Sequence, residues 1–248
     1  MSDHTHTNSF PLTDPVKSVE ELNERFSDGD VDAILRWGWE VFGNKMVIGT
    51  GFGPSGAVLM HKTHQLKLPF KVFYLDTNLL FRQTYELRDR YAELFGVLFE
   101  RVSTGVSLED QAGQFGEKLW NTNPDKCCHI RKVLPLQNHL KDKQVWVTGV
   151  RRDQSASRKK TRLFEWDSLN EVLKLNPLAG WTADDVWLYI KLYDLPYNPL
   201  HDHGYPSIGC QPCTKPVADE SDERSGRWSG NAKTECGIHV VTQNTSDK

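Results

Sequence analysis

The stretch over residues 45–64 constrains the fold more than any other part of this chain. A short apolar run at 45–50 predicts a buried strand, a loop with three glycines follows at 51–56, and residues 57–64 have a helical pattern. Glycines let the backbone approach a bound anion, and a helix N-terminus presents free N–H groups to it. The stretch therefore predicts an α/β fold that binds a phosphate-like group at the end of a strand.

The glycine spacing leaves three interpretations open. The loop matches G-x-G-x-x-G, and the next apolar run, at 72–75, ends at Asp76, 20 residues after Gly56. That spacing is typical of NAD-binding domains, in which the acidic residue binds a ribose. Pro54 inside the turn fits a pyrophosphate loop of the nucleotide alpha-hydrolase type equally well, and a tight structural turn is the third alternative. The candidate binding residues are Gly51, Gly53, Ser55, Gly56 and Asp76.

Helical and strand patterns alternate along the rest of the chain. This alternation predicts an α/β fold with a twisted, mostly parallel sheet and helices on both faces, and ligands bind at the carboxyl ends of such strands. We expect residues 1–15 to be disordered, 16–217 to form one domain and 218–248 to form a mobile arm. The helices are expected at 16–25, 31–42, 81–95 and 183–193, and further strands at 97–99, 144–148 and 172–175.

Composition excludes several classes of protein. No run of the 248 residues approaches 18 apolar positions, which argues against a membrane span, and the polar stretch 1–13 carries no signal-peptide pattern. We therefore expect a cytoplasmic location and no membrane partner. A net charge of −3 gives no general attraction to nucleic acid. Five cysteines in a reducing compartment indicate metal binding or catalysis instead of disulfides.

Four of the five cysteines form two tight pairs. Cys127 and Cys128 are adjacent, and Cys210 and Cys213 follow 82 positions after Cys128. Four thiolates suit zinc or a [4Fe–4S] cluster, but adjacent cysteines are awkward for tetrahedral zinc, whose ligands are usually two to four residues apart. The spacing therefore favours the cluster. A vicinal disulfide with a redox C-x-x-C, or four unligated thiols, are the alternatives.

Basic residues gather beside these motifs. A run at 149–162 contains Arg151 and Arg152 and directly follows the strand expected at 144–148, and Lys132 lies near the first cysteine pair. Arginine forks bind oxyanions through two parallel hydrogen bonds, so the run predicts an anion site. A solvated charged loop is the alternative interpretation. A cation near the cluster could link it electrostatically to an anionic substrate.

The fifth cysteine, Cys236, stands alone in a polar, glycine-containing tail. It is either an accidental exposed thiol or a nucleophile on a mobile arm. Nearby cations lower the pKa of a thiol and so favour the reactive thiolate. The cations that could do this are Lys233, His239 and the pair Arg224 and Arg227.

Several of these motifs together resemble the assimilatory adenylyl-sulfate (APS) and phosphoadenylyl-sulfate (PAPS) reductases. The resemblance covers about residues 40–240 and no single motif carries it. It rests on Cys-Cys-x-x-Arg-Lys at 127–132, Gly-Val-Arg-Arg-Asp-Gln-Ser at 149–155, Cys-x-x-Cys at 210–213, Arg-x-Gly-Arg-Trp at 224–228 and Glu-Cys-Gly-Ile-His at 235–239. One departure is a stretch at 228–235 that looks shorter and less aromatic than is usual in the family.

The resemblance implies a fold like that of the adenine nucleotide alpha-hydrolases, with the glycine loop holding the adenylate. It implies that Cys236 is the nucleophile and that the four paired cysteines bind a [4Fe–4S] cluster. The anion-binding residues that it implies are Lys132, Arg151 or Arg152, Arg224, Arg227 and His239, and His239 is expected to be catalytic together with Cys236.

Members of that family with both cysteine pairs are typically APS reductases. The implied activity is thioredoxin-dependent reduction of APS to sulfite and AMP through a cysteine S-sulfonate, in assimilatory sulfate reduction. Thioredoxin or glutaredoxin is the implied reductant, and a homo-oligomer is possible. The alternatives are the same chemistry on PAPS or on both nucleotides, an NAD-linked oxidoreductase with a metal site, and a non-catalytic metal-binding module.

Overall fold

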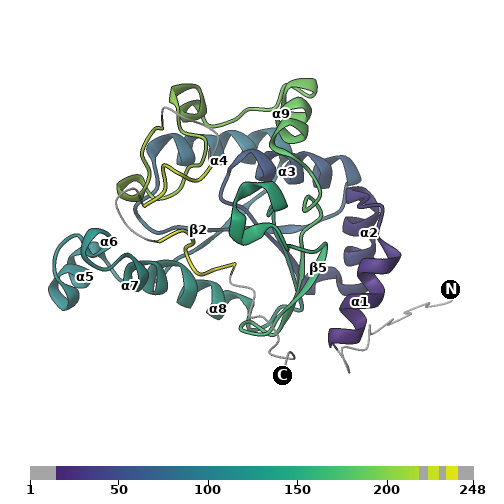
Figure 1. The fold of residues 1–248 in the computed structure, drawn as a ribbon, viewed down its shortest axis with the longest axis horizontal. Coiled ribbons are helices and arrows are strands. Elements are labelled where there is room, and N and C mark those ends of the chain that lie inside the picture. Colours follow the sequence, from purple (N-terminus) through teal and green to yellow (C-terminus); the bar gives the residue numbers. More distant parts are fainter. Residues whose placement is uncertain (1–14, 218–222, 229–232, 240–248) are drawn as a thin grey trace.

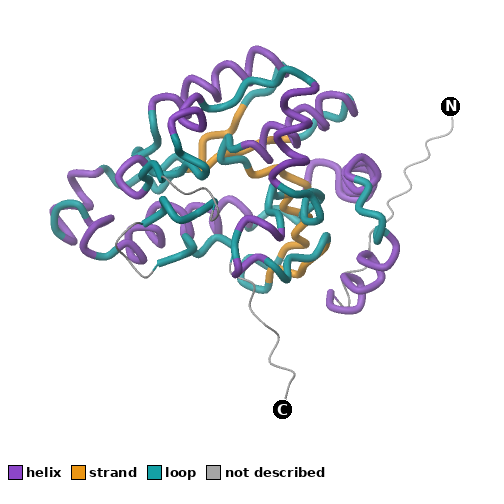
Figure 2. Tube along the Cα trace, turned by 45° about the horizontal axis from the view of Figure 1, so that its top comes forward, coloured by secondary structure: helices purple, strands orange, loops and turns teal. Residues whose placement is uncertain are grey.

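A six-stranded sheet forms the centre of the computed structural model, which describes residues 15–217, 223–228 and 233–239 (Figures 1 and 2). The strand order is β3-β2-β1-β4-β6-β5, and every pair is parallel except β5 with β6. The strands are β1 (Met46–Gly49), β2 (Lys71–Leu75), β3 (Phe99–Val102), β4 (Val145–Val147), β5 (Phe164–Asp167) and β6 (Val172–Leu175). The expected fold class, a mostly parallel sheet with helices, is confirmed.

Helices cover both faces of the sheet. They are α1 (Pro15–Arg25), α2 (Val31–Phe42), α3 (Pro54–Leu66), α4 (Arg82–Phe95), α5 (Leu108–Phe115), α6 (Leu119–Thr122), α7 (Pro124–Cys128), α8 (Leu134–Leu140) and α9 (Ala183–Leu192). Successive strand residues point to opposite faces. Met46 and Ile48 accordingly pack with α1 to α4 and α9, whereas Val47 packs with α8 on the other face. Within the described residues, no helix combines the length and the apolar character that a membrane span needs.

Local signals set most element boundaries. The Asp30 side chain accepts hydrogen bonds from the N–H groups of Asp32 and Ala33 and so caps α2, which spans the expected range 31–42. The strand expected at 97–99 is wrong in position: β3 begins at Phe99, because Gly96 ends α4 in the left-handed region and Leu98 is 93% exposed.

The antiparallel strand β5 has no counterpart among the expected strands. Its sequence, Phe-Glu-Trp-Asp, carries two acidic residues and gives no clear apolar run. Glu165 is nevertheless buried, because the Lys174 ammonium of the neighbouring β6 lies 3.0 Å from its carboxylate. The ion pair joins two neighbouring strands, so the residues next to Glu165 in the sequence do not indicate that β5 is a buried strand.

From β1 the chain adds β2 and β3 on one side of the sheet and β4 on the other, so β1 and β4 form its switch point. A crevice opens between the loops that follow these two strands. β1 pairs with β2 on one side and with β4 on the other, so the loops after β1 and β4 diverge at the carboxyl end of the sheet. These two loops still approach closely: a Cβ on Gly149 would lie 3.0 Å from the Ser55 Cβ. The fold therefore places the glycine loop and the basic loop at one ligand edge.

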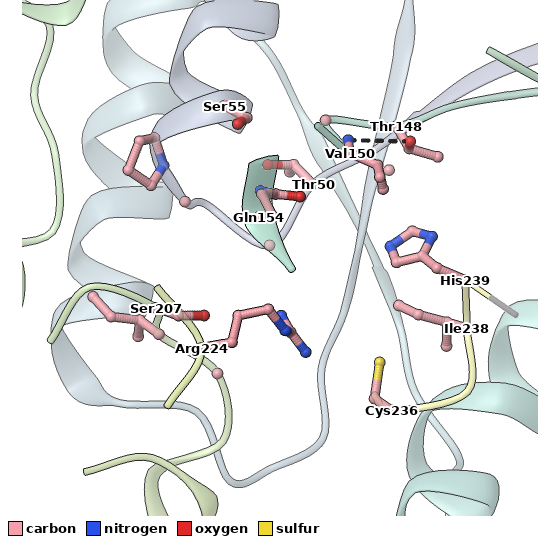
Figure 3. A pocket seen from close by; sticks show the side chains of 18 of the residues that line it. Thr50, Ser55, Thr148, Val150, Gln154, Ser207, Arg224, Cys236, Ile238 and His239 are labelled. Atoms are coloured by element: carbon pink, nitrogen blue, oxygen red, sulfur yellow. Dashed lines mark hydrogen bonds between the residues drawn. The ribbon is translucent and has the colours of Figure 1, made fainter. Parts of the chain in front are cut away.

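Both described segments of the predicted arm reach this edge. Trp228 donates its N–H to the Cys213 carbonyl at 2.9 Å, and Thr214 forms a β-bridge with Arg227. The segment 233–239 lies beside the open end of the sheet, where Figure 3 shows it carrying Cys236, Ile238 and His239. The disorder expected at 1–15 falls almost entirely outside the described residues. The mobility of 218–248 stays a prediction.

Candidate active site

A cavity of about 260 Å³ opens at the carboxyl ends of β1 and β4. Side chains from segments far apart in the sequence point into it (Figure 3). Its lining includes Gly51, Gly53, Ser55, Gly56, Lys132, Thr148, Arg151, Gln154, Arg158, Ser207, Arg224, Arg227, Cys236 and His239. Most of the candidate binding residues, together with the lone cysteine, therefore share one cavity.

The glycine loop presents backbone donors to this cavity. The first N–H that bonds within α3 is that of Ala57, which donates to the Gly53 carbonyl at 3.1 Å. The N–H groups of Ser55 and Gly56 therefore remain available at the positive end of the helix dipole. Gly56 has no room for a side chain, because a Cβ would lie 2.6 Å from the Thr50 hydroxyl. The loop has the form of an anion site.

Asp76 lies outside the cavity lining, contrary to the expectation that it binds a ligand. Its carboxylate accepts hydrogen bonds from the Arg101 guanidinium at 2.6 Å, the Tyr85 hydroxyl at 2.7 Å and the Asn78 N–H at 2.9 Å. Burial raises the pKa of Asp76, but these hydrogen bonds lower it by more. Asp76 therefore organises the turn after β2, and the ribose contact of an NAD-binding domain has no support here.

The structure distinguishes the two neighbouring arginines. Arg151 is 2% exposed and donates to the Ser55 hydroxyl at 2.7 Å, while its other nitrogens contact Asp153 and Glu223. It therefore joins the glycine loop to the basic loop. Arg152 is absent from the cavity lining and donates its Nε to the Thr161 carbonyl at 2.8 Å.

Several polar residues in the lining, Arg158, Gln154 and Glu223 among them, were not candidates from the sequence. Arg158 and Gln154 lie in the same basic run as Arg151, and Glu223 lies next to Arg224. The basic run was a signal for Arg158, but nothing in it indicated which of its cations faces inward. Burial raises the pKa of Glu223, and the Arg151 charge opposes this rise.

The Cys236 thiol lies in a cationic environment. It is 8% exposed, and burial raises its pKa. The Lys132 ammonium, the Ile238 N–H and the Arg227 guanidinium lower the pKa by more, so the balance favours the thiolate. Lys132, which the family resemblance implies as an anion-binding residue, is also the largest of the influences that lower the pKa of this thiol.

The surroundings of His239 disfavour the positive charge expected of it. Burial lowers its pKa well below the ordinary value, and the nearby charges of Lys174, Arg158, Arg224 and Lys132 lower it further. The His239 ring stacks on Trp146, with ring centroids 5.2 Å apart and an interplanar angle of 11°. This contact fixes the end of the segment that carries Cys236.

Several buried nitrogens around the cavity lack a partner within the described parts of the chain. They include Nδ1 of His239, Nε1 of Trp146 and Nε of Arg227. A buried polar atom without a hydrogen bond costs roughly 1–3 kcal/mol. A polar ligand in the cavity could satisfy these atoms, and oxyanions are the best match for the cationic lining.

The four paired cysteines line a second, enclosed pocket next to the first. Cys127 and Cys128 come from α7, and Cys210 and Cys213 flank a short turn. Lys132 contacts both the cysteine pocket and the main cavity. Burial and the neighbouring thiols raise the pKa of Cys127 and of Cys213 to about 11. Thiolates in this pocket would repel one another, so a positive charge between them would stabilise their ionised form.

Four thiols line this pocket, and thiolates are the usual ligands of iron–sulfur clusters. Among the residues the structure describes, no three histidine, cysteine or acidic side chains converge closely enough for one metal ion. An iron–sulfur cluster offers a separate iron to each thiolate, so its ligands need not converge on one point. The Thr77 hydroxyl lies 3.2 Å from the Cys210 sulfur, a polar contact suited to a sulfur ligand.

Fold and site together define a class: α/β proteins with a cationic cavity at the sheet's switch point and a cysteine thiol in its lining. The comparisons specify the family. Residues 45–216 match the phosphoadenosine phosphosulfate reductase domain. The chain belongs to this family.

Curated relatives agree over most of the length. A protein of Salinibacter ruber named adenosine 5'-phosphosulfate reductase is 53% identical over 221 residues, which cover 88% of this chain and 87% of that protein. A Bacillus subtilis protein named adenosine 5'-phosphosulfate reductase 2 is 42% identical and covers 88% of this chain and 94% of its own length.

Solved structures support the fold. The phosphoadenylyl-sulfate reductase of Candida auris, in a phosphate complex, has a TM-score of 0.71 and 30% identity and covers 81% of this chain and 97% of its own. The FMN adenylyltransferase of Candida glabrata has a TM-score of 0.57 at 12% identity and covers 88% of this chain and 70% of its own, a likeness of fold alone.

Proposed function

We propose that this protein reduces APS to sulfite and AMP through an S-sulfonate on Cys236, in assimilatory sulfate reduction. The observation that carries the proposal is the position of the Cys236 thiol, in a cavity that also contains Lys132, Arg224 and Arg227. The names of the curated relatives support the choice of substrate. PAPS, or both nucleotides, is the second candidate, since the Candida auris structure bears the name of a PAPS reductase.

In the first step, the Cys236 thiolate attacks the sulfur of the sulfate group. A sulfur–sulfur bond forms, the bond from sulfur to the bridging oxygen breaks, and AMP leaves with that electron pair. An anion must approach an anionic group, so the main obstacle is electrostatic. Lys132, Arg224 and Arg227 reduce the repulsion and stabilise the charge of the transition state. The glycine loop and Arg151 would hold the adenylate.

In the second step, a dithiol protein attacks the Cys236 sulfur. Sulfite leaves with the electron pair of the sulfur–sulfur bond, and a mixed disulfide forms. The second thiol of the partner then breaks this disulfide, releases Cys236 and leaves the partner oxidised by two electrons. Thioredoxin or glutaredoxin has the required chemistry. A thiol-based cycle of this kind needs a reducing compartment, which favours the cytoplasm.

The cofactor that we assign to the second pocket is a [4Fe–4S] cluster held by Cys127, Cys128, Cys210 and Cys213. When bound, it would supply positive charge and structural cross-links between α7 and the turn at 210–213. Lys132, which contacts both pockets, orients the sulfate toward the thiolate. The two thiol steps already account for both electrons.

The direct test is to trap the intermediate. Protein purified without air is incubated separately with APS and with PAPS in the absence of reductant, and the Cys236 peptide is weighed by mass spectrometry. We expect a sulfonate adduct with APS alone. An adduct with both nucleotides would keep the mechanism and remove the specificity. No adduct with either, on protein that retains its cluster, would overturn the proposal.

Substitution of Gly209 tests the position of Arg227. A Cβ at Gly209 would lie 2.1 Å from Nη2 and 2.4 Å from Cζ of Arg227, so the guanidinium must move. In Gly209→Ala we expect the KM for APS to rise roughly 10- to 100-fold through loss of a charged contact, because arginine–oxyanion pairs are strong. Steady-state kinetics measures the change.

The matched control is Gly180→Ala. A Cβ there would meet Arg152, which lies outside the cavity lining, at an ordinary 3.7 Å. This control should retain the wild-type KM, and both variants should melt within a few degrees of wild type. A wild-type KM in Gly209→Ala would show that the position of Arg227 does not matter for binding.

A further inference from the structure

Glu235 precedes the proposed nucleophile but is absent from the cavity lining. Its carboxylate accepts a two-pronged contact from Arg158, with Nε at 2.8 Å from Oε1 and Nη2 at 2.9 Å from Oε2. Arg224 donates Nη2 to Oε2 at 3.2 Å, and the Ser157 hydroxyl donates to Oε1 at 3.3 Å. A single carboxylate thus joins two arginines that both face the cavity.

The two arginines come from separate parts of the chain. Arg158 ends a short turn in the loop after β4, where its Nη1 also donates to the Gln154 side chain at 2.6 Å. Arg224 lies in the segment 223–228 and donates to the Thr234 carbonyl at 3.1 Å. Glu235 therefore connects three segments: the basic loop, 223–228 and 233–239.

These ion pairs are well shielded from solvent. The side chain of Arg158 is 11% exposed, that of Arg224 is 12% and that of Glu235 is 19%. Exposed ion pairs contribute little, but a two-pronged arginine–carboxylate pair with low exposure has the geometry of the stronger ones. Lys233, by contrast, pairs with Asp125, whose side chain is 80% exposed. Glu235 is thus the better-shielded acidic contact of this segment.

The charge of Glu235 opposes the reaction next to it. A carboxylate repels the anionic sulfate and disfavours the Cys236 thiolate. It also shares the positive charge of two arginines that would otherwise face the substrate alone. A direct electrostatic contribution to the chemistry is therefore unfavourable, and the benefit of this residue must come from where it holds the chain.

We propose that Glu235 is a positioning residue that docks the segment 233–239 on Arg158 and Arg224 and so holds Cys236 over the cavity for sulfonate transfer. The expected effect of Glu235 on the rate of sulfonate transfer rests on the proposed function. Cleavage of the S-sulfonate by a dithiol has the opposite requirement, because the Cys236 sulfur must then be accessible to the partner. Weakening the ion pairs should therefore slow the first step without slowing the second.

The test compares Glu235→Gln with wild type, both as anaerobic, cluster-loaded protein. The first measurement needs no nucleotide: the rate of Cys236 alkylation by iodoacetamide, followed across pH. Loss of the carboxylate also changes the thiol pKa, so the comparison uses the plateau at high pH, where the thiol is fully ionised in both proteins. We expect the plateau rate to rise roughly 5- to 30-fold, the range that a shielded ion pair can account for.

The second measurement is single-turnover S-sulfonation with APS. In Glu235→Gln we expect the maximal rate to fall roughly 5- to 30-fold, with little change in the APS concentration at half saturation. Cleavage of the preformed S-sulfonate by dithiothreitol should be as fast as in wild type or faster. Glu235→Asp keeps the charge on a shorter side chain and should recover most of the maximal rate.

Two controls separate docking from general damage. Asp125→Asn breaks the exposed Lys233 contact and should keep the wild-type rates. Glu235→Gln should lose its effect in an Arg158→Gln background if it acts through that arginine. Unchanged alkylation and sulfonation in Glu235→Gln would overturn the inference. If wild-type protein forms no adduct with APS, the proposed function fails, whereas the alkylation plateau still decides whether Glu235 docks the segment.

Discussion

Cys236→Ser is expected to lower APS turnover by at least about 10⁴-fold, the scale on which removal of a covalent nucleophile acts. A serine hydroxyl is not ionised near neutral pH and cannot form the sulfur–sulfur bond that the dithiol later breaks. Release of sulfite from APS, measured with a dithiol reductant, gives the change in rate.

The same variant should keep its ligands. Cys236 is not one of the four cysteines of the second pocket, so the iron–sulfur absorbance should equal that of wild type. AMP binding, measured by calorimetry, should also be retained. More than about 1% of wild-type turnover would contradict the nucleophile assignment, since residual catalysis without a nucleophile lies far below that level.

Lys132→Met is the second large effect that we expect, with kcat/KM for APS reduced by about 10² to 10³, as for removal of one transition-state charge contact. Lys132 is the largest favourable influence on the Cys236 thiolate and contacts both pockets. Methionine keeps most of the length of the side chain and removes the ammonium. The loss should appear mainly in the sulfonation rate, which single-turnover mass spectrometry measures.

Two further variants test whether the effect of Lys132→Met depends on the shape and the position of the lost cation. Lys132→Arg keeps the charge but brings a wider, planar group into an enclosed site, so we expect it to recover little activity. Lys126→Met removes an exposed lysine on α7 whose ammonium lies 3.8 Å from the centroid of the Phe115 ring. It should retain wild-type activity. Equal loss in Lys126→Met and Lys132→Met would mean that only the net charge of the region matters.

Much of the fold followed from short-range patterns. The glycine loop, helix α2 and the apolar runs of β1, β2 and β6 each depend on neighbouring residues, and the structure contains each of them close to its expected position. Strand β5 depended instead on the burial of Glu165 by Lys174. Local propensity carries no information about such a pair.

In the candidate site, too, some features could be predicted from short sequence patterns and others could not. Cysteine and glycine spacing indicated the chemical groups, and the structure places Ser55, Gly56, Lys132, Arg151 and Cys236 around one cavity. The basic run could not show that Arg151 faces inward, that Arg152 holds a carbonyl, or that Arg158 pairs with Glu235. Asp76 had the expected spacing for a ribose contact and is used by Arg101 and Tyr85 instead.

What the sequence alone determined is the set of chemical groups: a glycine loop whose backbone can approach an anion, four thiols in two tight pairs, and one separate thiol among cations. These follow from the properties of single residues and from spacings of a few positions. Only the tertiary structure decided which charges meet. Ionisation and hydrogen bonding depend on distances of a few ångströms between residues such as Arg158 and Glu235, 77 positions apart, and the packing of the sheet and its loops sets those distances.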